Sequence, residues 1–535
     1  MALSDAVDAL IGGHGLTMSL VLGGVFIVVF WRLSTPRLDP QEPPILKARI
    51  PVIGHFLGML LNSHGYWKML YDENPMPACT LPMLGGKMYI INEPSLISAA
   101  FRARSLSFDP HLIKTIKYTT PISAKAMDIL NSDGFWPRWV KLFYSSMTGT
   151  DLFKMNIVVL GDIFRQINYL PLNMEVEDTS IWLRGMLTTS TITALLGKDN
   201  PLCKDRSLIA KLWEWEGCLH HFLLGPAPWL TSSSAYQARA DIHKALTEYF
   251  ASAAPLAPDV SELTIAALSL QDEYDYSAKD KAAMMMAILQ GALANTIPTA
   301  YWFTMHLFSR PALVAKLRKE LKPLAVPGPQ LANGKQEMLL DIRGLESRAP
   351  LLMAAYRETQ RTIGVGCLHR WVKSDTLLTS ATDPGKTYLL KKDTPLLMSM
   401  LVNHQHEAHW GANVSEYQPE RFLRSDSRDD EREFNAGAPV PRGAYTPFGG
   451  GKHLCPGKDF ANAENWGTMI AFLLGFDFTT PEGETLEVPQ RTMPLPANTL
   501  GRPTAGSDLR SSVRRRKGWE NVVWKVGEPT ISKDS

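Results

Sequence analysis

The chain has 535 residues, 45% of them hydrophobic, and its 55 basic and 53 acidic side chains give a formal net charge of +2. A chain of this length can bury a large core, and the nearly neutral balance excludes the broad basic surface of a nucleic-acid-binding protein. The sequence has no C-x-x-C pair and no G-x-G-x-x-G segment after a strand-like run, so we expect a reducing compartment and no dinucleotide site. Its five scattered cysteines are Cys79, Cys203, Cys218, Cys367 and Cys455.

The first predicted element is an apolar helix at residues 11–31, which at 1.5 Å per residue would span roughly 30 Å, about one hydrocarbon core. A cleaved signal peptide is the alternative, but Asp5 and Asp8 precede the run where basic residues are usual. Basic residues follow the run at 32, 37, 47 and 49, so the positive-inside rule places the remaining chain in the cytosol. Residues 1–34 are therefore predicted to be a single-pass anchor in the endoplasmic reticulum membrane.

Prolines at 36, 40, 43 and 44 predict a stiff, extended connector between this anchor and one globular domain, which together with the connector covers residues 35–535. The apolar periodicity of the domain is mainly helical, with short strands around Gly85 and Gly86. Residues 108–129 have little periodicity, and we expect a loop over a pocket there. The predicted fold class is mainly α with a small β region.

Residues 205–250 predict two helices separated by a proline-containing segment at 225–230. Two interpretations fit its apolar side chains equally well, a loop that dips into the membrane interface and ordinary packing between two helices. These side chains are Phe222, Leu223, Leu224, Trp229 and Leu230.

Residues 280–310 predict a long buried helix that contains Pro298. Proline has no N–H to bond the carbonyl of Ala294, so the helix should kink and leave a free acceptor beside Asn295 and Thr296. We expect this acceptor to hold water or bound oxygen.

A buried charge cluster is predicted from two later segments. Glu358 and Arg361 are three residues apart and would share one helix face, and Arg421, from the Pro-Glu-Arg-Phe segment at 419–422, would join them. Such a cluster must be complete, because removing one partner of a buried ion pair costs about 3–5 kcal/mol.

The stretch FGGGKHLCPG at residues 448–457 holds one thiol in a loop of unusual backbone freedom. The glycines at 449–451 permit positive φ and a close approach to a flat ligand, and Gly457 lets the chain turn into the next helix. Cys455 would then lie at a helix N-terminus, which favours the thiolate that ligates iron. A phosphate loop is excluded, because Thr446 and His453 occupy positions where that motif needs glycine and Ser or Thr; a buried structural cysteine is the other alternative.

Together these motifs resemble those of the cytochrome P-450 monooxygenases. The family's haem-binding pattern, F-x-x-G-x-[RH]-x-C-x-G, is met at Phe448, Gly451, His453, Cys455 and Gly457. The E-x-x-R pair and the P-E-R-F segment precede it in the family's order. The resemblance implies the cytochrome P-450 fold and a haem b whose iron has Cys455 as axial thiolate, with the other four residues of the pattern around the cofactor.

The resemblance also implies roles outside the loop. Arg370 would reach a haem propionate, and the charge cluster would lock the proximal side of the haem. The family's W-x-x-x-R pattern is broken here, because a valine stands four residues after Trp136. Either Arg138 or Lys141 substitutes for the missing arginine, or neither does and the tryptophan belongs to the core.

The segment at residues 290–298 departs from the family's usual A-G-x-[DE]-T. Ala294 stands where an acid is usual and Asn295 where a threonine is usual, as in the subgroup that contains the sterol 7α- and 12α-hydroxylases and prostacyclin synthase. This likeness implies Asn295 and Thr296 as catalytic residues that organise water for proton delivery.

The implied activity is the oxidation of a large apolar substrate, such as a terpenoid or sterol in secondary-metabolite biosynthesis. Electrons would come from NADPH through a membrane-bound cytochrome reductase that docks near Lys452 and Lys458. One alternative is a haem-thiolate isomerase that rearranges a peroxide without NADPH or O₂, as prostacyclin synthase does. Another is a haem-binding protein without enzymatic activity.

Overall fold

The computed structural model describes residues 21–25, 38–48, 50, 53–83, 86–225, 227–383, 385–423, 440–493 and 499–527. The chain divides into two compact units. The first unit comprises Met1–Phe108 and Cys367–Val402, and the second comprises Asp109–Gly366 and Asn403–Ser535. The described chain is mainly helical with small sheets, which confirms the predicted fold class.

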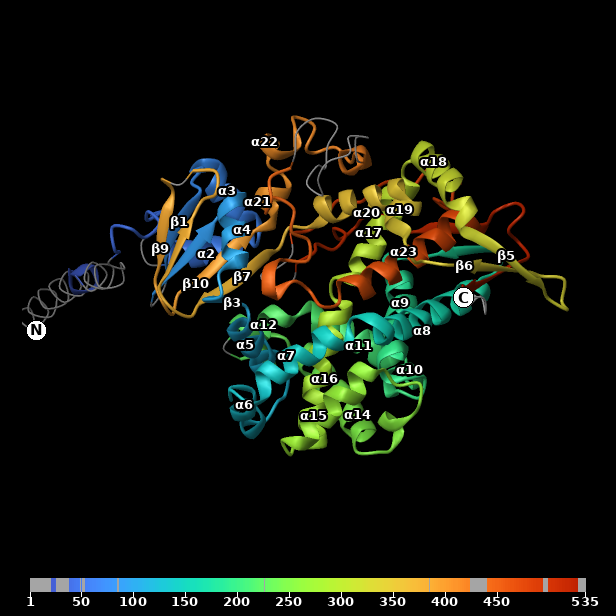
Figure 1. Cartoon of the computed structure of the whole chain (residues 1–535), viewed down its shortest axis with the longest axis horizontal. Coiled ribbons are helices and arrows are strands. Elements are labelled where there is room, and N and C mark those ends of the chain that lie inside the picture. The colour runs from blue at the N-terminus through green and yellow to red at the C-terminus, as the bar shows by residue number, and fades with distance from the viewer. Residues whose placement is uncertain are drawn as a thin grey trace, which may run out of the picture. The chain divides into compact units, whose positions relative to one another are not determined.

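The first unit is built around a five-stranded sheet whose strands come from two distant parts of the chain, drawn in blue and orange in Figure 1. Its strands are β1 (Ala78–Met83), β2 (Gly86–Ile91), β3 (Leu106–Ser107), β7 (Cys367–Val372) and β10 (Pro395–Ser399), and a separate pair is β8 (Thr376–Thr379) and β9 (Thr387–Leu390). Its helices are α2 (Gly54–Asn62), α3 (Gly65–Glu73) and α4 (Pro94–Arg102), and α21 (Met400–His404) follows β10 across the unit boundary.

The order of this sheet is β1-β2-β10-β7-β3, so the late strand β10 lies between two neighbours of different origin. It runs parallel to β2, with Leu397 opposite Ile90, and antiparallel to β7, with Leu397 opposite His369. Alternate residues on one face, including Tyr89 and Met398, are buried against α4. This period of two is the pattern of a sheet with one covered face.

The segment predicted as a stiff connector is in part docked on this sheet. The Thr80 hydroxyl donates to the Pro43 carbonyl over 2.6 Å, and the Thr80 N–H donates to the Pro44 carbonyl over 2.8 Å. Glu42 is buried and accepts from both Lys87 and Tyr89. The connector prediction is therefore wrong for residues 42–46. Strand β1 binds the Pro43 and Pro44 carbonyls and the Leu46 N–H, and β2 binds the Glu42 carboxylate.

The predicted anchor lies almost entirely outside the described residues. Of positions 11–31 only 21–25 are described, and they are helical. Among the described ranges no helix combines the length and the apolar character needed to cross a bilayer. The anchor remains a prediction.

The second unit contains most of the helices. They are α5 (Asp109–Thr119), α6 (Ala124–Leu130), α7 (Phe135–Ser146), α8 (Gly149–Asn168), α9 (Thr179–Leu196), α10 (Pro201–Lys204), α11 (Ser207–Gly217), α12 (Leu219–Leu224), α13 (Pro228–Thr231), α14 (Ser233–Phe250), α15 (Glu262–Glu273), α16 (Ala278–Leu293), α17 (Thr296–Phe308), α18 (Pro311–Leu321), α19 (Leu345–Arg348), α20 (Pro350–Ile363), α22 (Glu407–Trp410) and α23 (Lys458–Gly475).

Two three-stranded sheets complete this unit, in the orders β11-β12-β4 and β13-β6-β5. Their strands are β4 (Asn173–Val176), β5 (Ala325–Gln330), β6 (Gln336–Leu340), β11 (Phe476–Thr479), β12 (Ser511–Arg515) and β13 (Val522–Val526). The core centres on α17, of whose 13 residues 11 are buried. A helix apolar on all sides belongs inside a bundle, and α9, α20 and α23 surround this one.

The loop predicted at residues 108–129 is wrong, because α5 and α6 occupy this stretch. Asp109 stands in the first turn of α5, and the Ser123 hydroxyl caps α6 by accepting from the Ala126 N–H over 3.2 Å. Helix α6 thus begins at a capping side chain, and α5 begins with an acidic first turn. The apolar pattern of both helices is too irregular to reveal them.

The segment at 222–230 is divided between core and surface. Phe222 is buried, whereas Trp229 is 60% exposed and Leu230 is 78% exposed. Packing between helices therefore accounts for the first residue and leaves the other two in contact with solvent.

The close approach of α23 to α8 yields a stability prediction. A Cβ at Gly467 would lie 2.4 Å from Cδ2 of the fully buried Leu160, so we expect Gly467→Ala to lower the free energy of unfolding by about 1–3 kcal/mol through overpacking. At Gly161, which follows Leu160 in α8, an added Cβ would meet nothing within 4 Å. Gly161→Ala should therefore raise the free energy of unfolding by about 0.5–1 kcal/mol. Urea unfolding of both variants checks the pair, and a change of the same sign in both would contradict it.

Candidate functional site

The cysteine loop uses positive φ at two of its four predicted glycines. Gly449 has φ 72° and Gly451 has φ 64°, a region that favours glycine. Gly450 is extended at φ −176°, and Gly457 has φ −81°, so backbone freedom is not what these two positions require. At Gly457 an added Cβ would meet the Cys455 sulfur at 3.9 Å, so glycine keeps space beside the thiol.

The backbone around Cys455 is tied to both sides of the loop. The Cys455 N–H donates to the Phe448 carbonyl over 3.0 Å, and the Lys458 N–H donates to the Cys455 carbonyl over 3.3 Å. Helix α23 begins at Lys458, so the thiol precedes a helix N-terminus as predicted. His453 lies in the short 3₁₀ turn before it, with Nδ1 3.8 Å from the Asp109 carboxylate.

The protonation of Cys455 reflects two opposed effects. The residue is accessible to solvent, yet enough protein surrounds its sulfur that desolvation raises the pKa of the thiol. The Gly457 N–H and Lys458 oppose this rise and favour the thiolate. The expectation that the helix N-terminus favours the thiolate agrees with the effect of the Gly457 N–H, but desolvation is the larger effect on this pKa. The charge of a coordinated metal would also favour the thiolate.

The other four cysteines offer no comparable ligand. Burial raises the pKa of Cys79 to about 12, and it also raises the pKa of Cys367, which lies inside β7 with its sulfur 3.4 Å from Nδ1 of His64. Cys203 and Cys218 are half-buried in the helical unit. Only Cys455 combines solvent access with a loop shaped to approach a ligand.

Helix α7 carries an observation that fits a haem with acidic substituents. The indole Nε1 of Trp136 is buried and has no hydrogen-bond partner among the described residues. Such a donor suits a carboxylate acceptor, because an unsatisfied buried N–H costs about 1–3 kcal/mol. The chain therefore fits the cofactor that the resemblance implies, both in its thiol and in this donor.

Neither Arg138 nor Lys141, the predicted substitutes for the missing arginine, has a contact that assigns it to an acidic haem substituent. Arg138 is 2.7 Å from the Glu273 carboxylate of α15 and lies over the Tyr274 ring at 5.9 Å. Lys141 is exposed on α7. The arginine is therefore committed to α15, and the lysine remains the unassigned alternative.

The structure brings together the three residues of the predicted charge cluster. Arg361 Nε is 2.7 Å from one Glu358 oxygen and its Nη2 is 2.8 Å from the other, while Arg421 Nε is 3.4 Å from the carboxylate. Glu358 and Arg361 are fully buried and Arg421 nearly so. The Gln418 N–H also donates to Glu358 over 2.9 Å, so the carboxylate fastens α20 to the segment at 416–421.

Arg370 belongs to the first unit, where it is buried on β7. Its guanidinium lies over the rings of Phe101 at 5.3 Å and Phe108 at 6.0 Å and donates to the His369 carbonyl over 2.8 Å. These contacts hold the side chain in a defined direction. Its role toward a propionate remains a prediction.

The long helix predicted at 280–310 is interrupted at Ala294 and Asn295, before Pro298 rather than at it. Helix α16 ends at Leu293 and α17 begins at Thr296. The Asn295 carbonyl accepts from the Thr299 hydroxyl over 2.7 Å, whereas Pro298 has no N–H to offer the Ala294 carbonyl. Asn295 is exposed and Thr296 is buried, so the amide is the accessible group of the pair.

The C-terminal stretch reaches this break, a contact that the sequence did not reveal. The Thr499 hydroxyl donates to the Asn295 side-chain carbonyl, and the Trp302 indole donates to the Gly501 carbonyl over 2.9 Å. The residues just before Thr499, 494–498, lie outside the described residues. No sequence signal marks Thr499, because its partner is 204 positions away.

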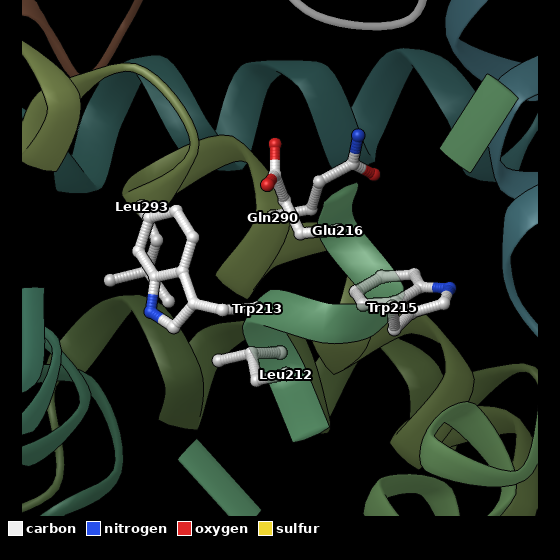
Figure 2. A pocket seen from close by; sticks show the side chains of 6 residues that line it. All are labelled: Leu212, Trp213, Trp215, Glu216, Gln290 and Leu293. Atoms are coloured by element: carbon white, nitrogen blue, oxygen red, sulfur yellow. The ribbon is translucent and has the colours of Figure 1, made fainter. Parts of the chain in front are cut away.

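A pocket opens between α11 and α16, next to the same break (Figure 2). It is lined by Leu212, Trp213, Trp215, Glu216, Gln290 and Leu293. The indole N–H groups are already bound within the unit, Trp213 to Thr188 over 2.9 Å and Trp215 to the Thr119 carbonyl over 3.1 Å. Their rings therefore contribute apolar surface.

The polar ends of Glu216 and Gln290 extend to one side of this pocket in Figure 2. Burial raises the pKa of Glu216, while its ion pair with Arg502 opposes that rise. The cavity volume is about 10 Å³, roughly the room that one water molecule needs. By itself this pocket has no room for a large apolar molecule.

Comparison with known proteins gives a consistent result. The family model described as "Cytochrome P450" matches residues 43–504. The chain is 29% identical over 529 residues to a "Cytochrome P450 monooxygenase" of Gibberella zeae, with 98% of each chain covered. It is 24% identical over 502 residues to "Cytochrome P450 monooxygenase nodJ" of Hypoxylon pulicicidum, covering 92% of this chain and 93% of that one.

A mammalian hydroxylase is also similar. The chain is 22% identical over 498 residues to the 5-beta-cholestane-3-alpha,7-alpha-diol 12-alpha-hydroxylase of Sus scrofa, covering 87% of this chain and 93% of the relative. These matches confirm the predicted family and its likeness to a sterol 12α-hydroxylase.

The charge cluster yields one prediction. Glu358→Gln leaves two buried guanidinium groups without their anion, so we expect the free energy of unfolding to fall by about 3–5 kcal/mol. The control is Glu346→Gln, because Glu346 is 70% exposed and its pair with Arg357 at 3.2 Å should contribute about 0.2–1 kcal/mol. Denaturant titration compares them, and equal losses would show that the cluster is not a buried network.

The cysteine loop yields a second prediction, which concerns the iron ligand. In the haem-loaded protein, Cys455→Ala should abolish the red-shifted absorbance of the reduced carbon monoxide complex, because only a thiolate ligand gives that electronic effect. Cys218→Ala, at a half-buried position in the same unit, should leave the band unchanged. A wild-type spectrum typical of histidine ligation would overturn the assignment of Cys455.

Proposed function

We propose that this chain, which belongs to the cytochrome P450 family, oxidises a large apolar molecule of the terpenoid or sterol class. Members of the family are monooxygenases that hold haem through a cysteine thiolate. We further propose that dioxygen is the oxidant and that electrons come from NADPH through a cytochrome reductase. The observation that carries the proposal is the break between α16 and α17, which leaves Asn295 exposed directly after a buried, apolar helix.

The names of the relatives support the same class of reaction. Two are monooxygenases of fungi, and one is a hydroxylase of a cholestane diol. These names support an oxygenase rather than the peroxide isomerase. The fungal relatives support the expectation of secondary metabolism.

Bound haem would supply the activation of dioxygen, with the thiolate promoting O–O cleavage. Cys455 would hold the iron, and Trp136 would donate to an acidic substituent of the haem. Phe448, Gly451, His453 and Gly457 would surround the cofactor in the cysteine loop, and Arg370 would reach a propionate.

The chain's own groups at the helix break have a separate task, the delivery of protons. The Asn295 amide has two N–H donors and one acceptor, and the Thr499 hydroxyl occupies the acceptor. The donors are therefore left to orient water, together with the Thr296 hydroxyl and the Ala294 carbonyl. The buried side chains of Trp213 and Leu293 would exclude bulk water from this end of α16.

The full-length, haem-loaded protein tests the proposal when it is incubated with a cytochrome reductase, NADPH, isotopically labelled dioxygen and a panel of sterols and terpenoids. We expect an NADPH-dependent product that contains one labelled oxygen atom. Rearrangement of a peroxide substrate without NADPH or dioxygen would overturn the proposal in favour of the isomerase.

We also propose that the protein is held on the endoplasmic reticulum membrane by residues 1–34, with the catalytic part in the cytosol. The exposed Trp229 and Leu230 offer a second, smaller contact with the lipid surface. Lys452 and Lys458, beside Cys455, would contribute to the reductase docking surface.

Deleting residues 1–34 should move the protein from the membrane fraction to the soluble fraction, because a membrane-spanning helix anchors far more strongly than a surface loop. Haem content should stay unchanged, since the segment precedes the residues matched by the family model. The pair Trp229→Ser and Leu230→Ser in the full chain serves as control and should stay on the membrane. Full retention of the truncated protein would assign anchoring to the surface loop instead.

The proton-delivery role predicts the effect of Asn295→Leu. A leucine of similar size has no donor for water, so we expect the folded haem spectrum to be kept while product formed per NADPH consumed falls and hydrogen peroxide rises. Asn131→Leu, at an exposed position after α6, should leave this ratio unchanged. An unchanged ratio in Asn295→Leu would exclude the amide from proton delivery.

A further inference from the structure

Tyr144, in the last turns of α7, contacts the cysteine loop directly. Its hydroxyl lies 2.9 Å from the Lys452 carbonyl oxygen and 2.7 Å from the Leu454 carbonyl oxygen. A phenolic hydroxyl has one proton, so the two carbonyls share a single donor. One side chain thus spans both sides of His453 from a helix about 310 positions away in sequence.

The Leu454 carbonyl matters because it belongs to the peptide group that leads into Cys455. The peptide group is planar, so its carbonyl and its N–H point to opposite edges of one plane. The carbonyl edge is held by Tyr144, and the N–H edge is held by the Phe448 carbonyl at 3.0 Å. With both edges bound, the plane has one orientation, and this fixes the N–Cα bond of Cys455 from which its Cβ and sulfur extend.

The loop needs such an external tie. Gly449 and Gly451 lie in the positive-φ region, and glycine loses more conformational freedom on ordering than any other residue. The loop precedes α23 and takes no hydrogen bonds from that helix at Leu454, whose own N–H bonds back to Gly451 within the loop over 3.1 Å. The Tyr144 hydroxyl is therefore a contact to Leu454 from outside the loop.

We propose that Tyr144 is a positioning residue that holds the Leu454–Cys455 peptide so that the thiolate is directed at the haem iron. The proposal rests on thiolate ligation by Cys455 and is independent of the substrate and of proton delivery at Asn295. Loss of the hydroxyl weakens thiolate ligation without removing the haem.

The test uses the full-length, haem-loaded protein and reads the reduced carbon monoxide complex, not turnover. At a fixed low urea concentration the spectrum gives the ratio of the complex that has lost its thiolate to the complex that keeps it. A lost hydrogen bond of ordinary strength should raise this ratio about 2- to 10-fold in Tyr144→Phe, with total haem unchanged. The matched control is Tyr169→Phe, because Tyr169 is 81% exposed at the end of α8 and should leave the ratio unchanged.

A donor-retaining variant decides whether the hydrogen bond is responsible. Replacing Tyr144 by para-aminophenylalanine keeps an N–H donor at the same place and should return the ratio to the wild-type value. Equal ratios in Tyr144→Phe and Tyr169→Phe would overturn the proposal. If Tyr144→Phe fails to hold haem at all, failure of para-aminophenylalanine to restore binding would overturn it equally, because the donor would then not be the cause.

Discussion

The buried carboxylate of Glu358 is the contact that joins distant segments of the second unit. It receives two nitrogens of Arg361, one of Arg421 and the Gln418 N–H, so helix α20 and the segment at 416–421 are joined at one anion. Arg361 in turn donates to the His404 carbonyl over 2.8 Å. An incomplete cluster would leave a charge in the core at a cost of several kcal/mol, so separation of these segments is disfavoured.

The cysteine loop meets the opposite difficulty, because it has much backbone freedom and little internal support. Two glycines with positive φ shape it, the Phe448 carbonyl binds the Cys455 N–H, and Tyr144 binds the preceding carbonyl. Desolvation by the surrounding protein disfavours the Cys455 thiolate, so binding of the metal would be coupled to loss of the thiol proton. The chain would set the position of the sulfur, and the positive charge of the iron would stabilise the thiolate.

The helix break at Ala294 and Asn295 shows how far local reasoning extends. Pro298 predicted a lost hydrogen bond and a free acceptor four residues earlier, and the helix does end there. The same reasoning missed Thr499, whose hydroxyl donates to the side-chain carbonyl of Asn295. It also missed the helices α5 and α6, whose apolar pattern is irregular. It also treated residues 42–46 as a connector, although Thr80 and Lys87 bind them.

The sequence by itself determined the mainly helical class, the thiol at position 455 and the family, because a ten-residue loop with fixed glycines and one cysteine is a local feature. It also determined that Glu358 and Arg361 share a helix face, since their spacing is set by the helix period. Only the tertiary structure decided which distant groups reach these residues: Arg421 and Gln418 at Glu358, Thr499 at Asn295, and Tyr144 at the carbonyl before Cys455. The physical reason is that hydrogen bonds and ion pairs act over about 3 Å in space, and no periodicity along the chain records which residues folding brings within that distance.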